Sequence, residues 1–232
     1  MQYAFPPAAI TTLEIAGQDA AFPVNRIFCV GRNYAAHAIE MGKDPTREAP
    51  FFFMKPSDAV LPVAAGTTGA LPYPAQTEDF QHEMELVVAI GKGGKDISVE
   101  QAMETVWGYA IGLDMTRRDV QGAAKKLGRP WDTGKAFEQS APIGPITPAA
   151  QAGEIGSAAI TLHVNGAVRQ SSTIDKLIWN VAETIADLST YFTLQPGDLI
   201  YTGTPAGVAA VQRGDELVGT ITGLGELRLK VV

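Results

Sequence analysis

Short apolar segments separated by turn residues constrain the fold of this 232-residue chain more than any other feature. The 24 glycines and 15 prolines are spread through the sequence, which predicts many short strands joined by turns. The segments expected to be strands are residues 13–15, 27–30, 51–54, 84–90, 107–113, 160–164, 199–202, 215–221 and 225–231. Helices are expected only at residues 34–41, 99–105, 116–127 and 176–190. Because strands dominate and the helices do not alternate with them, the expected fold class is α+β rather than a doubly wound sheet.

Two local patterns refine this prediction. Asn165-Gly166 predicts a tight hairpin, because this dipeptide tolerates positive φ at both central positions of a turn. Thr116 and Asp119 have the spacing of a capping box at the start of the third expected helix.

Composition narrows the classes of function. The 18 Lys and Arg residues against 25 Asp and Glu give a net charge of −7, which argues against a nucleic-acid-binding protein but not against one that binds an anionic metabolite through a metal. Cys29 is the only cysteine and lies in an apolar segment, so it is expected to be a core residue in a reducing compartment. The sequence shows no signal peptide and no apolar segment long enough to span a membrane. We therefore expect a cytoplasmic protein.

Glu83 and Glu85 introduce charge at the start of the apolar segment 84–90. Residues two apart on a strand face the same way, so these two carboxylates are expected to project side by side. Such a pair is unfavourable at the start of a buried strand unless a cation lies between the two groups. The alternative is that both lie at the exposed start of the strand and are simply solvated.

Asp114 ends the apolar segment 107–113 and directly precedes the third expected helix, a layout in which ligands are commonly presented. Together with Glu83 and Glu85 it makes three carboxylates without a paired cysteine or histidine. That set favours Mg²⁺ or Mn²⁺, and Ca²⁺ also suits such oxygen ligands. His82 lies on the opposite strand face from both glutamates, which favours a supporting role over direct coordination.

His37 and Glu40 stand three residues apart in the first expected helix, so they face the same side. A carboxylate beside an imidazole fixes its tautomer and makes it a competent general base near neutral pH. The alternative is an exposed histidine near a helical glutamate. The polar segment 42–48 that follows is expected to be a lid that orders on substrate binding.

Several basic and polar residues follow Asp114. Arg118, Gln121 and Lys125 lie at i, i+3 and i+7, on one face of a helix. A surface salt bridge is the alternative role for this face, and it is the role expected for Lys125. Lys135 lies in an apolar, glycine-containing segment, an unusual setting for a merely solvated lysine.

Six short motifs occur along the chain in a fixed order. They are Val30-Gly31-Arg32-Asn33-Tyr34-Ala35-Ala36-His37, Phe53-Met54-Lys55-Pro56-Ser57, His82-Glu83-x-Glu85, Leu113-Asp114-Met115-Thr116-x-Arg118-Asp119-Val120-Gln121, Gly134-Lys135-x-Phe137 and Tyr201-Thr202-Gly203-Thr204-Pro205-x-Gly207-Val208. Gly-Thr-Pro or Glu-x-Glu alone would be a weak signal. Together and in this order, the six resemble the fumarylacetoacetate hydrolase superfamily over residues 25–232.

The resemblance implies a β-rich, mixed-sheet roll with few short helices, a bound Mg²⁺ or Mn²⁺ ion and a homodimer. The catalytic domain would comprise residues 25–232, with residues 1–24 packed on the same domain. The resemblance places the metal ligands at Glu83, Glu85 and Asp114 and the catalytic residues at His37, Glu40 and Lys135. It places the substrate-binding residues at Arg118, Gln121, Thr204 and Lys55.

Within this superfamily the chain resembles the compact acylpyruvate hydrolase branch, and most of all its bacterial fumarylpyruvate hydrolases. The implied reaction is metal-dependent hydrolysis of a C–C bond in a small anionic 2,4-dioxo acid, with fumarylpyruvate giving fumarate and pyruvate in gentisate-type aromatic degradation. His37 and Glu40 would activate the water, the metal would act as a Lewis acid, and Lys135 or Gln121 would stabilise the oxyanion. The second carboxylate of the substrate needs a cation of its own, for which Arg32, Arg117, Arg129 and Lys43 are the candidates.

Three alternatives stay open. An oxaloacetate decarboxylase or a 2-oxo-ene-dioate isomerase could use the same scaffold, since both generate a related enolate. A non-catalytic metabolite-binding protein would need only the metal ligands. The presence of His37, Glu40 and Lys135 argues against that third alternative.

Overall fold

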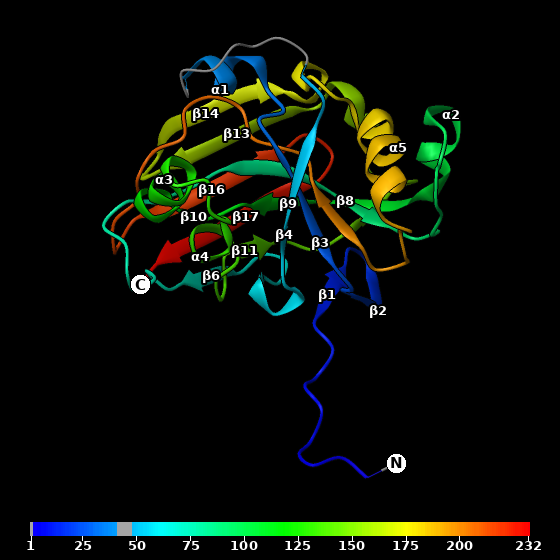
Figure 1. Cartoon of the computed structure of the whole chain (residues 1–232), viewed down its shortest axis with the longest axis horizontal. Helices are drawn as coiled ribbons and strands as arrows, with labels where there is room; N and C mark the ends of the chain where they lie inside the picture. The colour runs from blue at the N-terminus through cyan, green and yellow to red at the C-terminus, as the bar shows by residue number, and fades with distance from the viewer. Residues whose placement is uncertain (1, 41–47) are drawn as a thin grey trace.

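Two curled β-sheets packed face to face form the body of the protein (Figure 1). The computed structural model describes residues 2–40 and 48–232. The segment 42–48, expected to be a lid, lies outside the described residues except for Glu48, and Lys43 lies outside them too. The strand-rich architecture confirms the α+β class.

The larger sheet is mixed, with two parallel pairings among antiparallel ones. Its strands, in order across the sheet, are β4 (Phe51–Lys55), β3 (Ile27–Gly31), β15 (Leu199–Tyr201), β8 (Met84–Ile90), β9 (Val106–Leu113), β11 (Ala141–Ile143) and β5 (Val60–Pro62), with β12 (Thr147–Pro148) paired to β9. The smaller sheet has the order β14 (Ala167–Thr173), β13 (Ala159–Val164), β16 (Glu216–Ile221), β17 (Gly225–Val231) and β6 (Thr68–Leu71).

Two strand pairs and a few short helices complete the fold. The pairs are β1 (Thr12–Ile15) with β2 (Gln18–Pro23), and β7 (Phe80–Gln81) with β10 (Thr116–Arg117). The α-helices are α1 (Ala35–Glu40), α2 (Val99–Ala102), α3 (Arg118–Lys126), α4 (Asp132–Lys135) and α5 (Val181–Tyr191). The 3-10 turns are η1 (Ser57–Ala59), η2 (Met103–Thr105), η3 (Ile155–Ser157) and η4 (Ile174–Lys176). Figure 1 shows α2 beside α5 at one end of the molecule and α3 with α4 toward the other.

Strand β8 is buried along its whole length because both of its faces are covered. Met84, Leu86 and Val88 point into the core between the two sheets, together with Ile160 and Leu229 of the smaller sheet. The residues between them point to the other face. There Val87 and Ala89 pack with the β1–β2 hairpin through Leu13 and Phe22. Because alternate residues of a strand face opposite sides, Glu85 lies on the face of β8 that points away from the core between the sheets.

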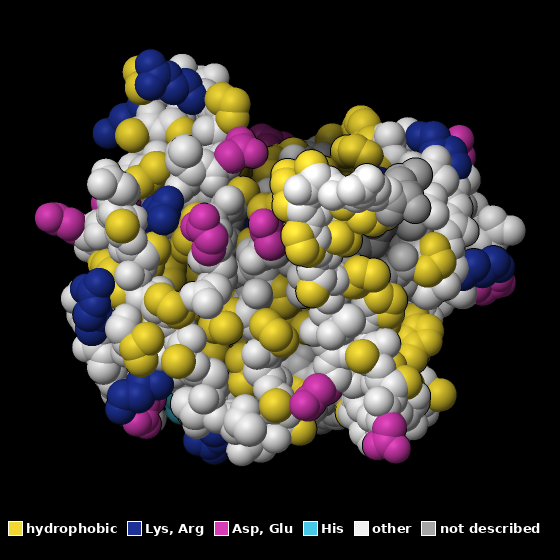
Figure 2. All heavy atoms as spheres, turned by 90° about the horizontal axis from the view of Figure 1, so that it is seen from below, with side chains coloured by type: hydrophobic (Ala, Val, Ile, Leu, Met, Phe, Trp, Pro, Cys, Tyr) yellow, Lys and Arg dark blue, Asp and Glu magenta, His cyan; other side chains and the backbone are white. Residues whose placement is uncertain are grey.

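The N-terminal segment divides into two parts. Residues 12–23 form the β1–β2 hairpin, which packs on the larger sheet. Residues 2–10 are exposed and extend away from the body (Figure 1). Their composition explains this, because neighbouring prolines at 6 and 7 lack the backbone N–H groups that a sheet pairing needs. Figure 2 shows the face from which this segment projects, with hydrophobic side chains over much of it and most Lys and Arg near its rim.

The local predictions have mixed outcomes. The hairpin at Asn165-Gly166 is confirmed, with φ of 51° and 78° at its two central residues. The capping box at Thr116 is wrong, because Thr116 lies in strand β10 and its hydroxyl donates to the Asp114 carbonyl at 3.2 Å. A capping box does occur at the start of α5, where Asn180 and Glu183 bond to each other's backbone N–H. Helix α5 therefore begins five residues later than predicted.

Within residues 2–40 and 48–232, no helix is both long and apolar enough to cross a membrane.

Candidate active site

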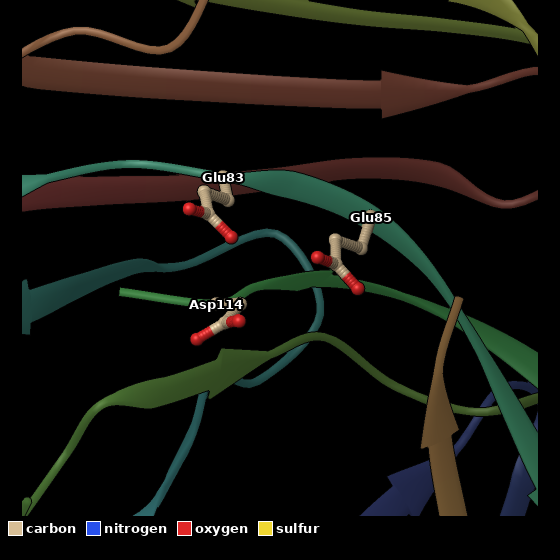
Figure 3. A group of neighbouring side chains, drawn as sticks. All are labelled: Glu83, Glu85 and Asp114. Atoms are coloured by element: carbon tan, nitrogen blue, oxygen red, sulfur yellow. The ribbon is translucent and has the colours of Figure 1, made fainter. Parts of the chain in front are cut away.

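Three buried carboxylates meet where strand β8 begins and its neighbour β9 ends, in the middle of the larger sheet (Figure 3). Glu83 precedes β8, Glu85 lies in it, and Asp114 follows its neighbour β9. The backbone N–H of Asp114 donates to the Glu83 carbonyl at 2.8 Å, which continues the pairing of the two strands and fixes these side chains together. One oxygen from each carboxylate lies within 4.8 Å of the others. Strand parity, the β8–β9 register and the turn after β9 together make this cluster.

Three cationic side chains contact the cluster. Lys135 Nζ donates to Glu83 Oε2 at 2.8 Å and to Asp114 Oδ2 at 2.7 Å. Arg118 forms an ion pair with the other oxygen of Glu83. Lys55 Nζ lies 2.8 Å from Asp114 Oδ1, at an angle that is poor for a hydrogen bond. Most of the negative charge is therefore balanced by ion pairs, but Asp114 Oδ1 has no hydrogen-bond donor among the described residues.

The two glutamates experience opposite environments although they stand two residues apart. Burial raises the pKa of the Glu85 carboxyl well above its usual range, and the neighbouring Asp114 and Glu83 charges raise it further. Burial acts in the same direction on Glu83, but Lys135 and Arg118 outweigh it and hold the Glu83 pKa well below its usual range. A further positive charge near Glu85 would therefore favour its ionised form.

A divalent cation fits this donor set. Asp114 Oδ1 accepts no hydrogen bond among the described residues and has only its ion pair with Lys55 at 2.8 Å, and Glu85 is a buried acid that lacks a cationic partner among the described side chains. One hard cation bound among the three carboxylates would give both Asp114 Oδ1 and Glu85 a positive partner. Carboxylate oxygens are the ligands that Mg²⁺ and Mn²⁺ prefer. The cluster can therefore hold a metal.

The surroundings of Lys135 favour its charged form. Burial acts to lower its pKa, but Asp114 and Glu83 outweigh that effect and raise the pKa above its usual value. Two of its three N–H donors are used by the carboxylates, and the side chain lines the cavity described below. Lys135 can therefore offer one further hydrogen bond or its charge to a substrate.

Lys55, predicted to bind substrate, lies behind the carboxylate cluster in this structure. Its fully buried ammonium donates to the backbone carbonyls of Lys135 and Met115, in addition to its ion pair with Asp114. It does not line the cavity, because Asp114 and the Lys135 main chain enclose it. This position suits a residue that orients Asp114 rather than one that contacts substrate.

The Thr202-Gly203-Thr204 segment closes over the glutamates. Gly203 has a φ of 100°, which favours glycine, and its N–H donates to Glu85 Oε2 at 2.8 Å. Thr204 Oγ1 donates to the Met84 carbonyl at 2.8 Å and accepts from Gln170 Nε2 at 2.8 Å. The hydroxyl of Thr204, a predicted substrate-binding residue, is thus bonded within the protein, and its backbone N–H is the group left to donate to a substrate.

His37 and Glu40 form a pair on helix α1. His37 Nδ1 lies 3.3 Å from Glu40 Oε2, and His37 is buried whereas Glu40 is partly exposed. The backbone N–H of Gly207 donates to both Glu40 oxygens at 3.1 Å. Gly207 has a φ of 98°, and a Cβ there would lie 1.9 Å from the Arg169 carbonyl oxygen. The Glu40 carboxylate is thus held from two sides, and it leaves His37 Nε2 for another partner.

A cavity of about 350 Å³ connects these groups. Most of the predicted site residues line it: His37, Glu83, Glu85, Arg118, Gln121, Lys135 and Thr204. Gln121 Oε1 accepts from Arg118 at 2.8 Å, so this pair from α3 forms one side of the cavity. Phe51, Phe53 and Trp131 supply an aromatic side. The cavity therefore combines a charged region with an apolar one, as small-molecule sites commonly do.

His82 lies away from the carboxylate cluster. Its Nδ1 is 3.0 Å from Gln170 Oε1, on strand β14 of the smaller sheet. The structure thus places His82 and the two glutamates on opposite sides of the chain, as the parity of the strand indicates.

Two residues that support the site carried no individual prediction. Gln170 bonds to the Met84 N–H, Thr204 Oγ1 and the Pro205 carbonyl, all at 2.8 to 3.0 Å. Asn33 Nδ2 donates to the Thr202 carbonyl at 2.8 Å and so links the segment after β3 to the segment after β15. Asn33 stood within a recognised motif, whereas Gln170 lies among polar neighbours on β14 and gave no signal.

The comparisons with known proteins agree with this geometry. Residues 26–232 match the family model described as fumarylacetoacetate hydrolase C-terminal. The chain belongs to this family. It is 52% identical over 188 residues to a fumarylpyruvate hydrolase of a Ralstonia species, covering 81% of this chain and 95% of that protein.

Solved structures give the same result. The crystal structure of fumarylpyruvate hydrolase from Pseudomonas aeruginosa in complex with Mn²⁺ and pyruvate is 61% identical, with a TM-score of 0.98, over 100% of this chain and 99% of that one. The chain is also 40% identical over 203 residues to an oxaloacetate tautomerase of Escherichia coli, covering 87% of this chain and 90% of that protein. The expected family and its β-rich roll are therefore confirmed.

Proposed function

We propose that this protein is a divalent-metal-dependent hydrolase that splits fumarylpyruvate into fumarate and pyruvate. The observation that carries the proposal is that one cavity is lined both by Glu83 and Glu85 of the carboxylate cluster and by His37, whose Nδ1 lies 3.3 Å from Glu40 outside the cavity lining. The carboxylate cluster would hold a metal and His37 would activate water. The similarity to fumarylpyruvate hydrolases over most of the chain supports the choice of substrate.

Glu83, Glu85 and Asp114 would hold Mg²⁺ or Mn²⁺, and a Mn²⁺ ion with pyruvate in the Pseudomonas aeruginosa structure supports this assignment. The ion would supply Lewis acidity at the 2-oxo acid end of the substrate. Lys135 and Lys55 keep Asp114 in place from two sides. Arg118 and Gln121 line the cavity and would orient the oxygens of the dioxo acid.

His37 would act as the general base. Glu40 accepts a hydrogen bond from His37 Nδ1–H, so Nε2 carries the lone pair that takes a proton from water. The hydroxide formed in this way adds to the C4 carbonyl. The C3–C4 bond then breaks, C3 receives the electron pair, and the proton held by His37 returns to C3. The new carboxylic acid loses its proton to solvent, so one water is consumed and fumarate, pyruvate and one proton result.

The test follows the dioxo-acid absorbance of fumarylpyruvate with Mg²⁺, with Mn²⁺ and after exhaustive chelation. We expect turnover with either ion, loss on chelation and recovery when the ion is restored. His37→Gln should lower kcat by about 10²–10⁴-fold, the usual contribution of a general base. His163→Gln, on strand β13 outside the cavity, is the matched control. Hydrolysis that survives chelation, or full activity in His37→Gln, would refute the proposal.

An activity on oxaloacetate is the second candidate. The similarity to an oxaloacetate tautomerase favours it, since oxaloacetate is also a small 2-oxo acid that forms an enol. The same assay with oxaloacetate as substrate distinguishes the two. Turnover of oxaloacetate without hydrolysis of fumarylpyruvate would replace the proposed function, and loss of CO₂ would indicate the decarboxylase.

The remaining inferences concern assembly and location. We infer a cytoplasmic homodimer that acts in aromatic catabolism, in line with the resemblance to the family. The edge strand β4, with half-buried Phe52 and exposed Met54, offers an apolar surface for a second copy. Light scattering coupled to size-exclusion chromatography would show a single species near twice the 24.6 kDa chain mass. A monomer at micromolar concentration would contradict this.

A further inference from the structure

Two cations line the cavity on a continuous aromatic surface. The Arg32 guanidinium lies over the Phe51 ring at 4.9 Å, and Lys125 Nζ lies over the Trp131 ring at 4.7 Å. The two rings contact each other edge to face, with centroids 5.7 Å apart. All four residues line the cavity. Arg32 and Lys125 are thus fixed to one wall although they come from different parts of the chain.

The ion pairs of the cavity show which cations are available to an anion. Arg118 and Lys135 are both bound to Glu83, and Lys135 also contacts Asp114. Arg32 has one ion pair, at 3.6 Å, with the exposed Glu48. Lys125 has no ion pair within the part of the chain that the structure describes. The surface salt bridge expected for Lys125 is therefore not seen there.

The other candidates for a second carboxylate site lie elsewhere. Arg117 stacks on Phe137 at 4.3 Å and donates to the Thr133 carbonyl. Arg129 lines a neighbouring cavity, which shares Phe51 and Trp131 with this one. Among the described candidates named from the sequence, only Arg32 lines the cavity that contains the carboxylate cluster.

We propose that Arg32 and Lys125 bind the second carboxylate of the substrate, with the planar acyl chain lying against Phe51 and Trp131. This assignment rests on the proposed function and extends it to specificity. It explains why an acylpyruvate whose acyl group ends in a carboxylate would be preferred over one that ends in a methyl group. A planar, conjugated chain also suits stacking against aromatic rings.

The local structure supports this assignment in two ways. Gly31 permits the aromatic wall, because a Cβ there would lie 2.0 Å from Phe51 Cζ. The surroundings of Lys125 favour an anion, since burial and the Arg118 charge lower its pKa to about 8, with Lys135 and Arg32 acting in the same direction and Glu83 against it. A carboxylate bound beside Lys125 would offset this repulsion.

The experiment compares fumarylpyruvate with acetylpyruvate, which lacks the second carboxylate. Lys125→Gln and Arg32→Gln should each raise KM for fumarylpyruvate about tenfold or more, the usual effect of losing one charge-assisted hydrogen bond. KM for acetylpyruvate should change much less, so the preference of the enzyme for fumarylpyruvate over acetylpyruvate falls. Lys126→Gln is the matched control, since Lys126 is the next residue on α3 and does not line the cavity.

The outcomes separate this proposal from the proposed function. Equal losses on both substrates, or an unchanged preference in Lys125→Gln, would overturn the carboxylate site while leaving the hydrolase intact. Absence of any acylpyruvate hydrolysis by the unaltered protein would instead refute the proposed function. Lys125→Arg keeps the charge and should restore most of the preference, which a merely structural role for Lys125 would not predict. Thermal unfolding of each variant confirms that it is folded.

Discussion

The two ends of the cavity are constructed in different ways. The carboxylate end, consisting of Glu83, Glu85 and Asp114, is buried, and each carboxylate is held by a backbone N–H or a cationic side chain. The aromatic end, consisting of Arg32, Phe51, Lys125 and Trp131, is half-buried or exposed, and its cations rest mainly on ring faces. The carboxylates of the first end are therefore held by partners within the protein, whereas Lys125 at the second end has no ion pair among the described residues.

The elements that carry the two ends explain this difference. The carboxylate end comes from β8 and β9, which lie in the middle of the larger sheet and are paired on both sides. The aromatic end comes from the edge strand β4, the end of β3 and the helices α3 and α4. A reaction that needs fixed ligands suits the sheet centre, whereas substrate choice can change at the edge without disturbing the core. We infer that chemistry and specificity are separated along this cavity.

The largest effect should come from breaking the carboxylate end. Asp114→Asn removes one ligand and leaves the buried Lys55 and Lys135 without their shared partner. We expect kcat/KM to fall at least about 100-fold with fumarylpyruvate and acetylpyruvate alike, because both need the metal. Steady-state kinetics and metal content per chain measure this. The exposed Glu104→Gln should match the unaltered protein. A loss confined to one substrate would contradict the separation of the two ends.

The second prediction concerns the aromatic end and the pH dependence of KM for fumarylpyruvate. The pKa of Lys125 is lowered to about 8 by burial and by Arg118, Lys135 and Arg32, with Glu83 opposing them. As the pH rises through about 8, Lys125 loses its proton and its attraction for a second carboxylate. KM for fumarylpyruvate should therefore rise by up to about tenfold between pH 7 and 9, while KM for acetylpyruvate rises less.

Lys125→Arg provides the control, since a guanidinium stays charged over this range. The rise in KM for fumarylpyruvate should then disappear. A rise of the same size in Lys125→Arg would assign the titration to another group.

The sequence predicts the sheet centre well because its signals are local. Two of the predicted strands, 84–90 and 225–231, have the observed bounds, since each is an apolar or strictly alternating segment. The short strands β5, β7, β10, β11 and β12 were not among the predicted strand segments, and neither were the longer β2, β6 and β14. The five short strands have two or three residues each and owe their pairing to distant partners rather than to their own pattern.

In the candidate site, too, contacts that depend on distant parts of the chain could not be predicted from the sequence. Strand parity alone places Glu83 beside Glu85, and the family motifs add Asp114 and the His37–Glu40 pair. No sequence pattern shows that Lys55 lies behind Asp114, or that Lys125 contacts Trp131. Both facts depend on how α3, α4 and β4 pack together, which spacing along the chain does not encode.

The smallest expected effect concerns the stability of the folded protein. It tests whether the carboxylate end destabilises the fold when no metal is bound. Burial and two neighbouring carboxylates raise the Glu85 pKa, so the folded protein binds this proton more tightly than the unfolded chain does. Without metal, stability should therefore fall as the pH rises from about 4.3, the pKa of an unperturbed glutamate, toward that raised value. Glu85→Gln cannot ionise, and its amide oxygen can still accept from the Gly203 N–H.

We expect chelated Glu85→Gln at pH 7 to be more stable than the chelated parent by about 1 kcal/mol, or roughly 2–4 °C in Tm. Added Mn²⁺ should raise the Tm of the parent but not that of the variant, because one ligand is lost. Calorimetry at pH 5 and pH 7, with and without Mn²⁺, measures both effects. A lower Tm for the chelated variant at pH 7 would show that Glu85 stabilises the fold by itself, and that the carboxylate end is not strained for metal binding.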